Sequence, residues 1–229
     1  MSTTAEQDYT KTIYAMTSEG TEVTTSALAS ALGVRPPSVS GMLKKLSREG
    51  LISRRGRGKI SLSASGRRLA LKTIRRHRLI ELFLVEIVGM PWDMVHDEAE
   101  RMEHAISSEF EDRIDELLGR PTVDPHGAPI PTSAGEMPEV SGLHLGKLPV
   151  GHRATVREVR DRDPEMLRYL RNIGLVPGRR VRLIEVLSFD GTVVVEINRR
   201  HRHLSQQVAG SVWVDADPEK ELGSSNKMS

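Results

Sequence analysis

The segment from His96 to His104 constrains the fold of this chain more than any other stretch, because it is amphipathic in an unusual way. It reads H-D-E-A-E-R-M-E-H. As a helix, with about 100° between successive residues, it places His96, Glu100, Glu103 and His104 within roughly 100° of arc. An apolar stripe lies beside them: Val95, Ala99, Met102 and Ile106. Ionisable groups at the edge of a core need compensation, which a divalent cation supplies. A solvated acidic face is the alternative interpretation.

A second cluster of the same kind precedes it. Residues 73–88 predict a strongly apolar helix, with His77 and Glu81 one turn apart on one face. His77 lies within R-R-H-R, so a surface histidine in a basic patch is its alternative role. Glu81 has apolar neighbours on both sides, and a carboxylate in such a run usually has a partner. This second pair favours a metal site.

Composition narrows the class of protein. The 229 residues suit one large or two small domains, and the chain has no cysteine. Disulfides, zinc–thiolate sites and cysteine nucleophiles are therefore excluded. The N-terminus is polar and no run of about 18 apolar residues occurs, so we expect a cytoplasmic protein without a membrane partner.

The net charge of +2 conceals a strong asymmetry along the chain. Residues 1–66 hold nine Lys or Arg against five Asp or Glu, a balance of +4. Residues 92–118 hold ten acidic residues against two arginines, a balance of −8. The first segment suits a polyanion and the second suits cations.

The N-terminal segment has the pattern of a winged helix-turn-helix. Helical spacing over 5–18 is followed by a short capped helix at 24–33 and a third helix that starts at Pro36 and stops at Gly50. Residues 51–62 then predict a β-hairpin with a basic tip, in the position of a wing. Helix, short glycine-containing turn and helix, followed by a basic hairpin, indicates DNA binding. A three-helix bundle with a basic surface is the alternative.

The expected DNA contacts lie on the outward side of the third helix, on the turn before it and on the wing. Short side chains near the helix start allow close approach to groove edges, and the cations hold phosphates. The predicted DNA-binding residues are Arg35, Pro37, Ser38, Ser40, Gly41, Lys44, Lys45, Arg48, Arg54, Arg55, Arg57 and Lys59.

The rest of the chain changes character twice. Helical segments are expected at about 64–88, 92–106 and 108–118, and five prolines between 121 and 138 mark a domain boundary or an extended strap. Short runs of β character then predict a small SH3-like β-barrel. The expected organisation is a DNA-binding domain at 1–66, a helical domain at 67–120, a Pro-rich linker at 121–142, an SH3-like domain at 143–217 and a disordered tail at 218–229.

Several of these segments together resemble the diphtheria toxin repressor family. They are the winged helix-turn-helix, R-H-R-L-x-E at 76–81, V-H-D-E-A-E-R-M-E-H at 95–104 and P-x-G-x-P-I-P at 125–131. The resemblance covers nearly the whole chain. It implies a metal-activated transcriptional repressor, not an enzyme, that binds double-stranded operator DNA as a homodimer through residues 67–120.

The resemblance also implies two metal sites. The primary site would use Asp8, Glu100, Glu103 and His104. The ancillary site would use His77, Glu81 and His96, completed from the SH3-like domain by Glu158 and Asp161.

Two departures from the family pattern refine this expectation. The iron-responsive branch has methionine and cysteine where this chain has Asp8 and Glu100, and hard oxygen ligands favour Mn²⁺. The expected role is therefore control of manganese homeostasis genes, with Fe²⁺ or Co²⁺ able to substitute. Lys11 lies where short manganese regulators carry a further carboxylate, which favours two separate sites over a binuclear cluster. The alternatives are a regulator that is metal-independent or iron-dependent, and a metallo-hydrolase, which no H-E-x-x-H supports.

Overall fold

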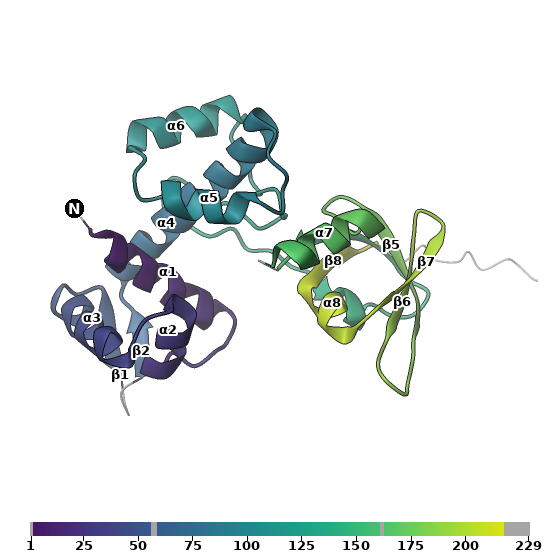
Figure 1. Cartoon of the computed structure of the whole chain (residues 1–229), viewed down its shortest axis with the longest axis horizontal. Helices are drawn as coiled ribbons and strands as arrows, with labels where there is room; N and C mark the ends of the chain where they lie inside the picture. Colours follow the sequence, from purple (N-terminus) through teal and green to yellow (C-terminus); the bar gives the residue numbers. More distant parts are fainter. Residues whose placement is uncertain (1, 56–58, 161–162, 218–229) are drawn as a thin grey trace, which may run out of the picture. The chain divides into compact units, whose positions relative to one another are not determined.

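The computed structural model describes residues 2–55, 59–160 and 163–217. These residues form two compact units. Unit 1 comprises Met1–Pro125 and Pro129–Glu139, and unit 2 comprises His126–Ala128 and Val140–Ser229. Figure 1 draws both units, and each is described by itself below.

The start of unit 1 is a winged helix-turn-helix, as predicted. Its elements are α1 (Thr4–Ser18), α2 (Thr25–Leu32), α3 (Pro36–Arg48), β1 (Ile52–Arg55) and β2 (Lys59–Leu62). Local signals set the helix ends. Thr24 caps α2, Gly33 ends it at a φ of 64°, and proline occupies the first turn of α3. The two strands pair antiparallel as the wing.

Apolar residues from all five elements of the winged helix share one core. Ile13 of α1, Leu28 of α2 and Val39 of α3 are fully buried in it, and Ile52 and Ile60 of the wing close it. Helix α1 also packs against α4. Its position therefore links the DNA-binding elements to the helices that follow.

The second part of unit 1 is helical. Helix α4 (Ala64–Phe83) runs into a π-helical turn, η1 (Leu84–Val88), so the predicted helix at 64–88 is confirmed in extent. Helix α5 (Val95–Met102) is shorter than the predicted segment at 92–106, and α6 spans Ser108–Leu117. After Met102 the chain closes a tight turn, with the Ala105 amide donating to the Met102 carbonyl at 2.9 Å, before Ser107 caps α6.

The proline-rich segment is a strap on α4 over residues 129–139. Arg75 of α4 donates to the Pro131 carbonyl at 2.9 Å, and Arg78 donates to the Pro129 carbonyl. Ile130 is buried against Leu79 and Ile114. Of the two interpretations of this segment, the strap therefore applies to this part of it.

Unit 2 is an antiparallel β domain of SH3-like size. Its sheet has the order β3-β8-β4-β5-β6-β7, and two short helices accompany it. The elements are β3 (Leu143–His144), η2 (Leu145–Lys147), β4 (Arg153–Val159), α7 (Pro164–Ile173), β5 (Arg180–Val186), β6 (Val193–Ile197), β7 (Arg200–Leu204), α8 (Gln206–Ser211) and β8 (Val212–Ala216). The SH3-like prediction is confirmed with one difference. Among the described strands, β3 and β7 remain edges, so the sheet does not close into a barrel.

Two further predictions concern the C-terminal tail and membrane-spanning helices. Residues 218–229, predicted to be a disordered tail, lie outside the described residues. Over the described ranges, no helix combines the length and the apolar character that crossing a bilayer requires.

Candidate metal centre

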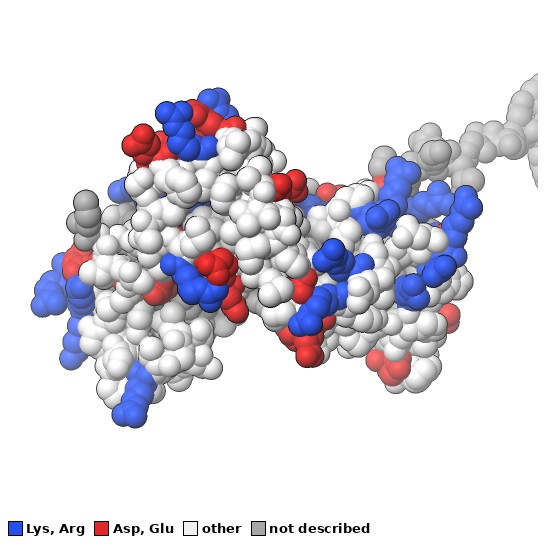
Figure 2. All heavy atoms as spheres, turned by 45° about the horizontal axis from the view of Figure 1, so that its top comes forward, with Lys and Arg blue, Asp and Glu red and all other residues white. Residues whose placement is uncertain are grey.

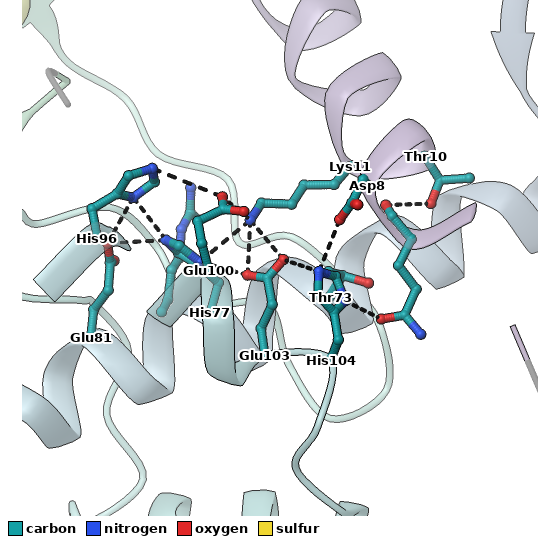
Figure 3. Close-up of polar contacts among 12 residues, drawn as sticks. Asp8, Thr10, Lys11, Thr73, His77, Glu81, His96, Glu100, Glu103 and His104 are labelled. Atoms are coloured by element: carbon teal, nitrogen blue, oxygen red, sulfur yellow. Dashed lines mark hydrogen bonds and ion pairs between the residues drawn. The ribbon is translucent and has the colours of Figure 1, made fainter. Parts of the chain in front are cut away.

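Four neighbouring pieces of unit 1 bring the predicted ligands together (Figure 3). Helix α1 contributes Asp8, α4 contributes His77 and Glu81, and α5 contributes His96 and Glu100. The turn after α5 contributes two more ligands, Glu103 and His104. Within unit 1 the described residues form two groups with the geometry of a metal site: Asp8, Glu103 and His104, and His77, His96 and Glu100.

The first group joins α1 to the turn after α5. His104 Nε2 lies 2.9 Å from Asp8 Oδ1 and 3.4 Å from Glu103 Oε1. The other ring nitrogen, Nδ1, lies 2.8 Å from Gln7 Oε1. A partner at Nδ1 fixes the orientation of a ligating imidazole and leaves Nε2 for the cation. The sequence analysis missed Gln7, since its role is visible only once α1 is placed beside His104.

The second group joins α4 to α5. The rings of His77 and His96 approach with Nε2 and Nδ1 3.1 Å apart. Glu81 Oε1 lies 3.0 Å from His77 Nε2 and 3.3 Å from His96 Nδ1. Glu100 Oε1 is 3.9 Å from His96 Nε2. The predicted trio His77, Glu81 and His96 therefore lies together, with Glu81 buried beneath the two rings.

The position of Glu100 differs from the prediction. It was expected with Asp8, Glu103 and His104, but its carboxylate groups with His77 and His96. The physical reason is Lys11, whose ammonium lies 2.7 Å from Glu100 Oε1 and 2.8 Å from Glu103 Oε2. This cation bridges the two carboxylates and lies between the two groups (Figure 3).

The pKa values of three of these groups reflect the crowding. Burial raises the pKa of Asp8, and the His104 ring only partly opposes this. Burial would lower the pKa of His77, but Glu81 and Glu103 outweigh it and raise the pKa. Burial would raise the pKa of Glu100, but Lys11 outweighs it and lowers the pKa. The cluster thus holds buried and partly buried titratable groups that interact strongly with one another.

The donor set fits a divalent cation of intermediate hardness. In each group the candidate ligand atoms lie within 4.8 Å of one another. Two ligands on opposite sides of a small divalent cation are separated by roughly 4 Å, so modest movement suffices. The atoms are carboxylate oxygens and imidazole nitrogens, and no sulfur takes part. Mn²⁺, Fe²⁺, Co²⁺ and Zn²⁺ all accept such ligands, and carboxylate oxygens are the harder of the two donor types.

The two ligands predicted from the SH3-like domain have separate outcomes. Glu158 is buried in unit 2, where Arg160 donates to both carboxylate oxygens, at 2.7 Å and 3.1 Å. Asp161 lies outside the described residues. Both assignments therefore remain predictions.

The predicted DNA-binding face of α3 is open to solvent. The residues predicted on it and on the turn before it are exposed, with one exception: Arg35, Pro37, Ser38, Ser40, Gly41, Lys44 and Arg48. The exception is Lys45, whose ammonium lies 2.6 Å from the buried carboxylate of Glu6 on α1. Lys45 therefore has a carboxylate partner within the protein, and its assignment as a phosphate contact remains a prediction.

The wing is described only in part. Lys59 begins β2 and is exposed. The backbones of Arg54 and Arg55 in β1 pair with those of Ile60 and Lys59 in β2. The side chains of Arg54 and Arg55, and all of Arg57, lie outside the described residues. Figure 2 shows lysine and arginine side chains projecting from the winged-helix end of unit 1.

Known protein families match segments of both units. The N-terminal DNA-binding domain of iron dependent repressors matches residues 1–59, and their metal binding and dimerisation domain matches 63–132. The FeoA domain matches residues 143–216. The iron-dependent repressor IdeR of Mycobacterium tuberculosis is 32% identical, over 90% of this chain and 95% of that protein. The chain belongs to the iron-dependent repressor family. It is a metal-dependent transcriptional repressor and not an enzyme.

Other members of the repressor family are similar over comparable lengths. The diphtheria toxin repressor of Corynebacterium efficiens is 32% identical over 90% of this chain and 93% of that protein. Among solved structures, a manganese-dependent transcriptional repressor in complex with manganese has a TM-score of 0.85 and 39% identity, covering 92% of this chain and 99% of that one. The manganese regulator SloR has a TM-score of 0.77 and 29% identity, covering 93% and 98%. The family resemblance seen in the sequence is confirmed.

Proposed function

We propose that this repressor responds to Mn²⁺ and controls manganese homeostasis genes in the cytoplasm, binding double-stranded operator DNA as a homodimer. The observation that carries the choice of metal is the pair of hard oxygen ligands at Asp8 and Glu100. Both side chains reach the cluster between α1, α4 and α5 (Figure 3). Fe²⁺ and Co²⁺ bind the same donor types and are the expected substitutes.

Two mononuclear sites fit the geometry best. Asp8, Glu103 and His104 would form the primary site, and His77, Glu81 and His96 the core of the ancillary site. Glu100 would complete the primary site by leaving its contact with Lys11. Because Lys11 contacts both Glu100 and Glu103, the Glu100 carboxylate already lies near the first group. Glu158 and Asp161 keep their place as candidates only through the family resemblance.

The switch follows from where the ligands are attached. Asp8 is on α1, which also supplies Tyr9 and Ile13 to the core of the winged helix. Glu103 and His104 follow α5, which packs on α4. A bound divalent cation supplies positive charge that lets these carboxylates and the imidazole converge. Asp8 and Glu103 then hold α1, and with it α3, in one orientation on the helical part, which selects a DNA-competent arrangement.

The dimer is supported by exposed apolar surface at the end of α4. Ile87 and Val88 of η1 and Met94 just before α5 are each more than half exposed, and Phe83 and Met90 lie partly buried beside the same cluster. An isolated surface patch of this kind marks an interaction site. The matching family domain is itself described as a dimerisation domain.

The relatives include regulators named for manganese and regulators named for iron. The similar solved structures are described as manganese-dependent, whereas the curated relatives named above include an iron-dependent repressor. The absence of cysteine removes the soft ligand expected of the iron-responsive pattern. The chemistry of this chain therefore favours manganese.

A parallel titration tests the choice of metal. Operator duplex, recovered from random-sequence DNA in the presence of all four metals, would be bound under anaerobic conditions while Mn²⁺, Fe²⁺, Co²⁺ or Zn²⁺ is increased. We expect Mn²⁺ to activate binding at cellular concentrations and with the largest amplitude. Activation by Fe²⁺ with no response to Mn²⁺ would contradict the proposal and favour an iron-dependent regulator.

A further inference from the structure

Lys11 occupies the centre of the cluster in the described structure. Its ammonium lies 2.7 Å from Glu100 Oε1 and 2.8 Å and 2.9 Å from the two oxygens of Glu103. His77 Nδ1 is 3.3 Å away on the remaining side. Figure 3 shows the side chain reaching from α1 toward α5, directly between the two ligand groups.

We propose that Lys11 is a built-in cation that competes with the activating metal and so sets the metal concentration at which the repressor responds. This inference rests on the proposed function and adds the residue that controls its threshold. In the absence of metal the ammonium holds Glu100 and Glu103. When metal is bound, the ammonium has left these oxygens.

The burial of the contact argues that the ammonium is an integral part of the metal-free state. The Lys11 side chain is 12% exposed and the Glu103 side chain is fully buried. A buried carboxylate without a partner is strongly destabilising, and the short contacts to Glu100 and Glu103 use the N–H donors of the ammonium. Exposed surface pairs contribute little by comparison. Together with His77, whose Nδ1 lies 2.6 Å from Glu103 Oε2, Lys11 therefore makes the empty cluster tolerable.

One ammonium cannot satisfy the cluster. Of the four carboxylates drawn in the cluster, the ammonium contacts Glu100 and Glu103, whereas Asp8 contacts His104 and Glu81 contacts His77 and His96. The surplus negative charge still attracts a divalent cation. The lysine thus lowers metal affinity without abolishing it.

The ammonium and a metal cannot use the same oxygens at once. Both Glu103 oxygens contact the lysine nitrogen, and these oxygens are also ligand candidates of the first group. A cation bound to either oxygen would lie within about 4 Å of the ammonium, where like charges repel strongly in a buried setting. The flexible four-carbon stem of lysine allows the ammonium to leave.

Competition of this kind shifts the threshold but not the ranking of metals. The free energy needed to displace Lys11 is the same whichever divalent metal replaces it. Lys11 should therefore change the affinity for Mn²⁺, Fe²⁺ and Co²⁺ by a similar factor. The choice among them remains with the ligand atoms themselves.

The direct test replaces the lysine in the full-length protein and measures metal binding without DNA. Lys11→Met keeps a side chain of similar length and removes the charge. Binding of Mn²⁺ would be followed by the loss of the EPR signal of free Mn²⁺, and thermal unfolding would be followed in excess EDTA. We expect Mn²⁺ affinity to rise by about tenfold or more and the unfolding temperature in EDTA to fall.

A matched control separates this effect from a change of net charge. Lys72→Met removes an exposed lysine of α4 whose ammonium donates to the Ser108 hydroxyl. It should change Mn²⁺ affinity less than about twofold, because it lies on exposed surface. Lys11→Arg keeps the cation and should keep the affinity close to that of the wild type. Lys11→Gln replaces Lys11→Met if circular dichroism shows that the methionine variant is unfolded.

The outcomes are distinct for the two proposals. Mn²⁺ affinity that is equal or weaker in both Lys11→Met and Lys11→Gln, with tight binding to the wild type, would overturn the competition and leave the metal-dependent function intact. Absence of Mn²⁺ binding to wild type and variants alike would overturn the proposed function itself.

Discussion

At the scale of single residues, we propose that Asp8 and Glu100 set the metal selectivity of the candidate centre. Both present oxygen to the cluster, from α1 and α5 respectively. Oxygen favours Mn²⁺, whereas thioether and thiolate favour softer metals. Both side chains are partly exposed, so each can be substituted without a change in the backbone around it.

The first prediction follows from these two ligands. The double variant Asp8→Met with Glu100→Cys should shift activation from Mn²⁺ toward Fe²⁺, Co²⁺ or Ni²⁺, by about tenfold or more in relative metal affinity. The measurement is the metal concentration giving half-maximal DNA binding for each ion. An unaltered ranking would show that these positions do not set selectivity.

The second prediction concerns the division of labour between the two groups. Glu103 connects His104, His77 and Lys11 and is fully buried, so Glu103→Ala should abolish metal-activated DNA binding. His96 lies in the group that joins α4 to α5, so His96→Ala should only raise the metal concentration needed. Metal titration of DNA binding distinguishes the two. Normal activation in Glu103→Ala together with loss of activation in His96→Ala would reverse the assignment.

The sequence predicted this site in part, and the missing part has a physical reason. Helical spacing places His77 beside Glu81, and it places His96 and Glu100 one turn apart, because such contacts are local. The relation of Asp8 to His104 came from a family resemblance, since no local pattern links α1 to α5. The capture of Glu100 by Lys11 depends on the lysine rotamer inside a packed cluster, which spacing does not encode.

A contact between α1 and α3 decides which cations of α3 point inward and which face solvent. Glu6 of α1 both caps its own helix and lies 2.6 Å from Lys45. Lys44 and Arg48 lie on the exposed side of α3. The inward cation and an outward cation, Lys45 and Lys44, are thus adjacent residues of α3. The sequence predicted the bounds of α3 correctly, but it could not reveal that Lys45 faces inward to another helix.

The third prediction tests the structural pair. The hydrogen bond from Lys45, more than any other contact, lowers the pKa of Glu6 below its ordinary value of 4.5. A lowered carboxylate pKa gives stability that is present above the unfolded-state pKa and is lost as pH falls through the folded-state pKa. Glu6→Gln should therefore lower the unfolding temperature by a few degrees at pH 7. The difference from wild type should shrink as the pH falls through the lowered pKa of Glu6, and a difference that is constant with pH would contradict this account.

The fourth prediction tests the cations that face outward. Lys44→Ala should weaken binding to all DNA sequences about equally and reduce the slope of log affinity against log salt by about 1 per protomer. Lys45→Ala should lower the unfolding temperature instead. Affinity measured between low and moderate salt, with unfolding measured in parallel, separates the two effects. A larger change of salt slope in Lys45→Ala than in Lys44→Ala would show that the inner and outer roles are exchanged.

At the scale of the whole molecule, the repressor combines a DNA-binding part, a candidate metal centre and exposed apolar surface in unit 1 with a separate β domain in unit 2. The cluster lies where α1 meets α4 and α5, and α1 belongs to the core of the winged helix. The sequence predicted these parts in their correct order because each has a distinct local pattern. It did not predict that β3 and β7 are edge strands among the described strands of unit 2, since strand pairing is a long-range property.

The central claim is that metal at the cluster switches DNA binding, and one measurement tests it most directly. The affinity of the wild-type protein for its operator duplex would be measured in excess EDTA and again with Mn²⁺, at one fixed salt concentration. We predict specific binding only with Mn²⁺, with the affinity in EDTA falling to that for random-sequence DNA. Unchanged operator affinity after complete chelation would contradict the account.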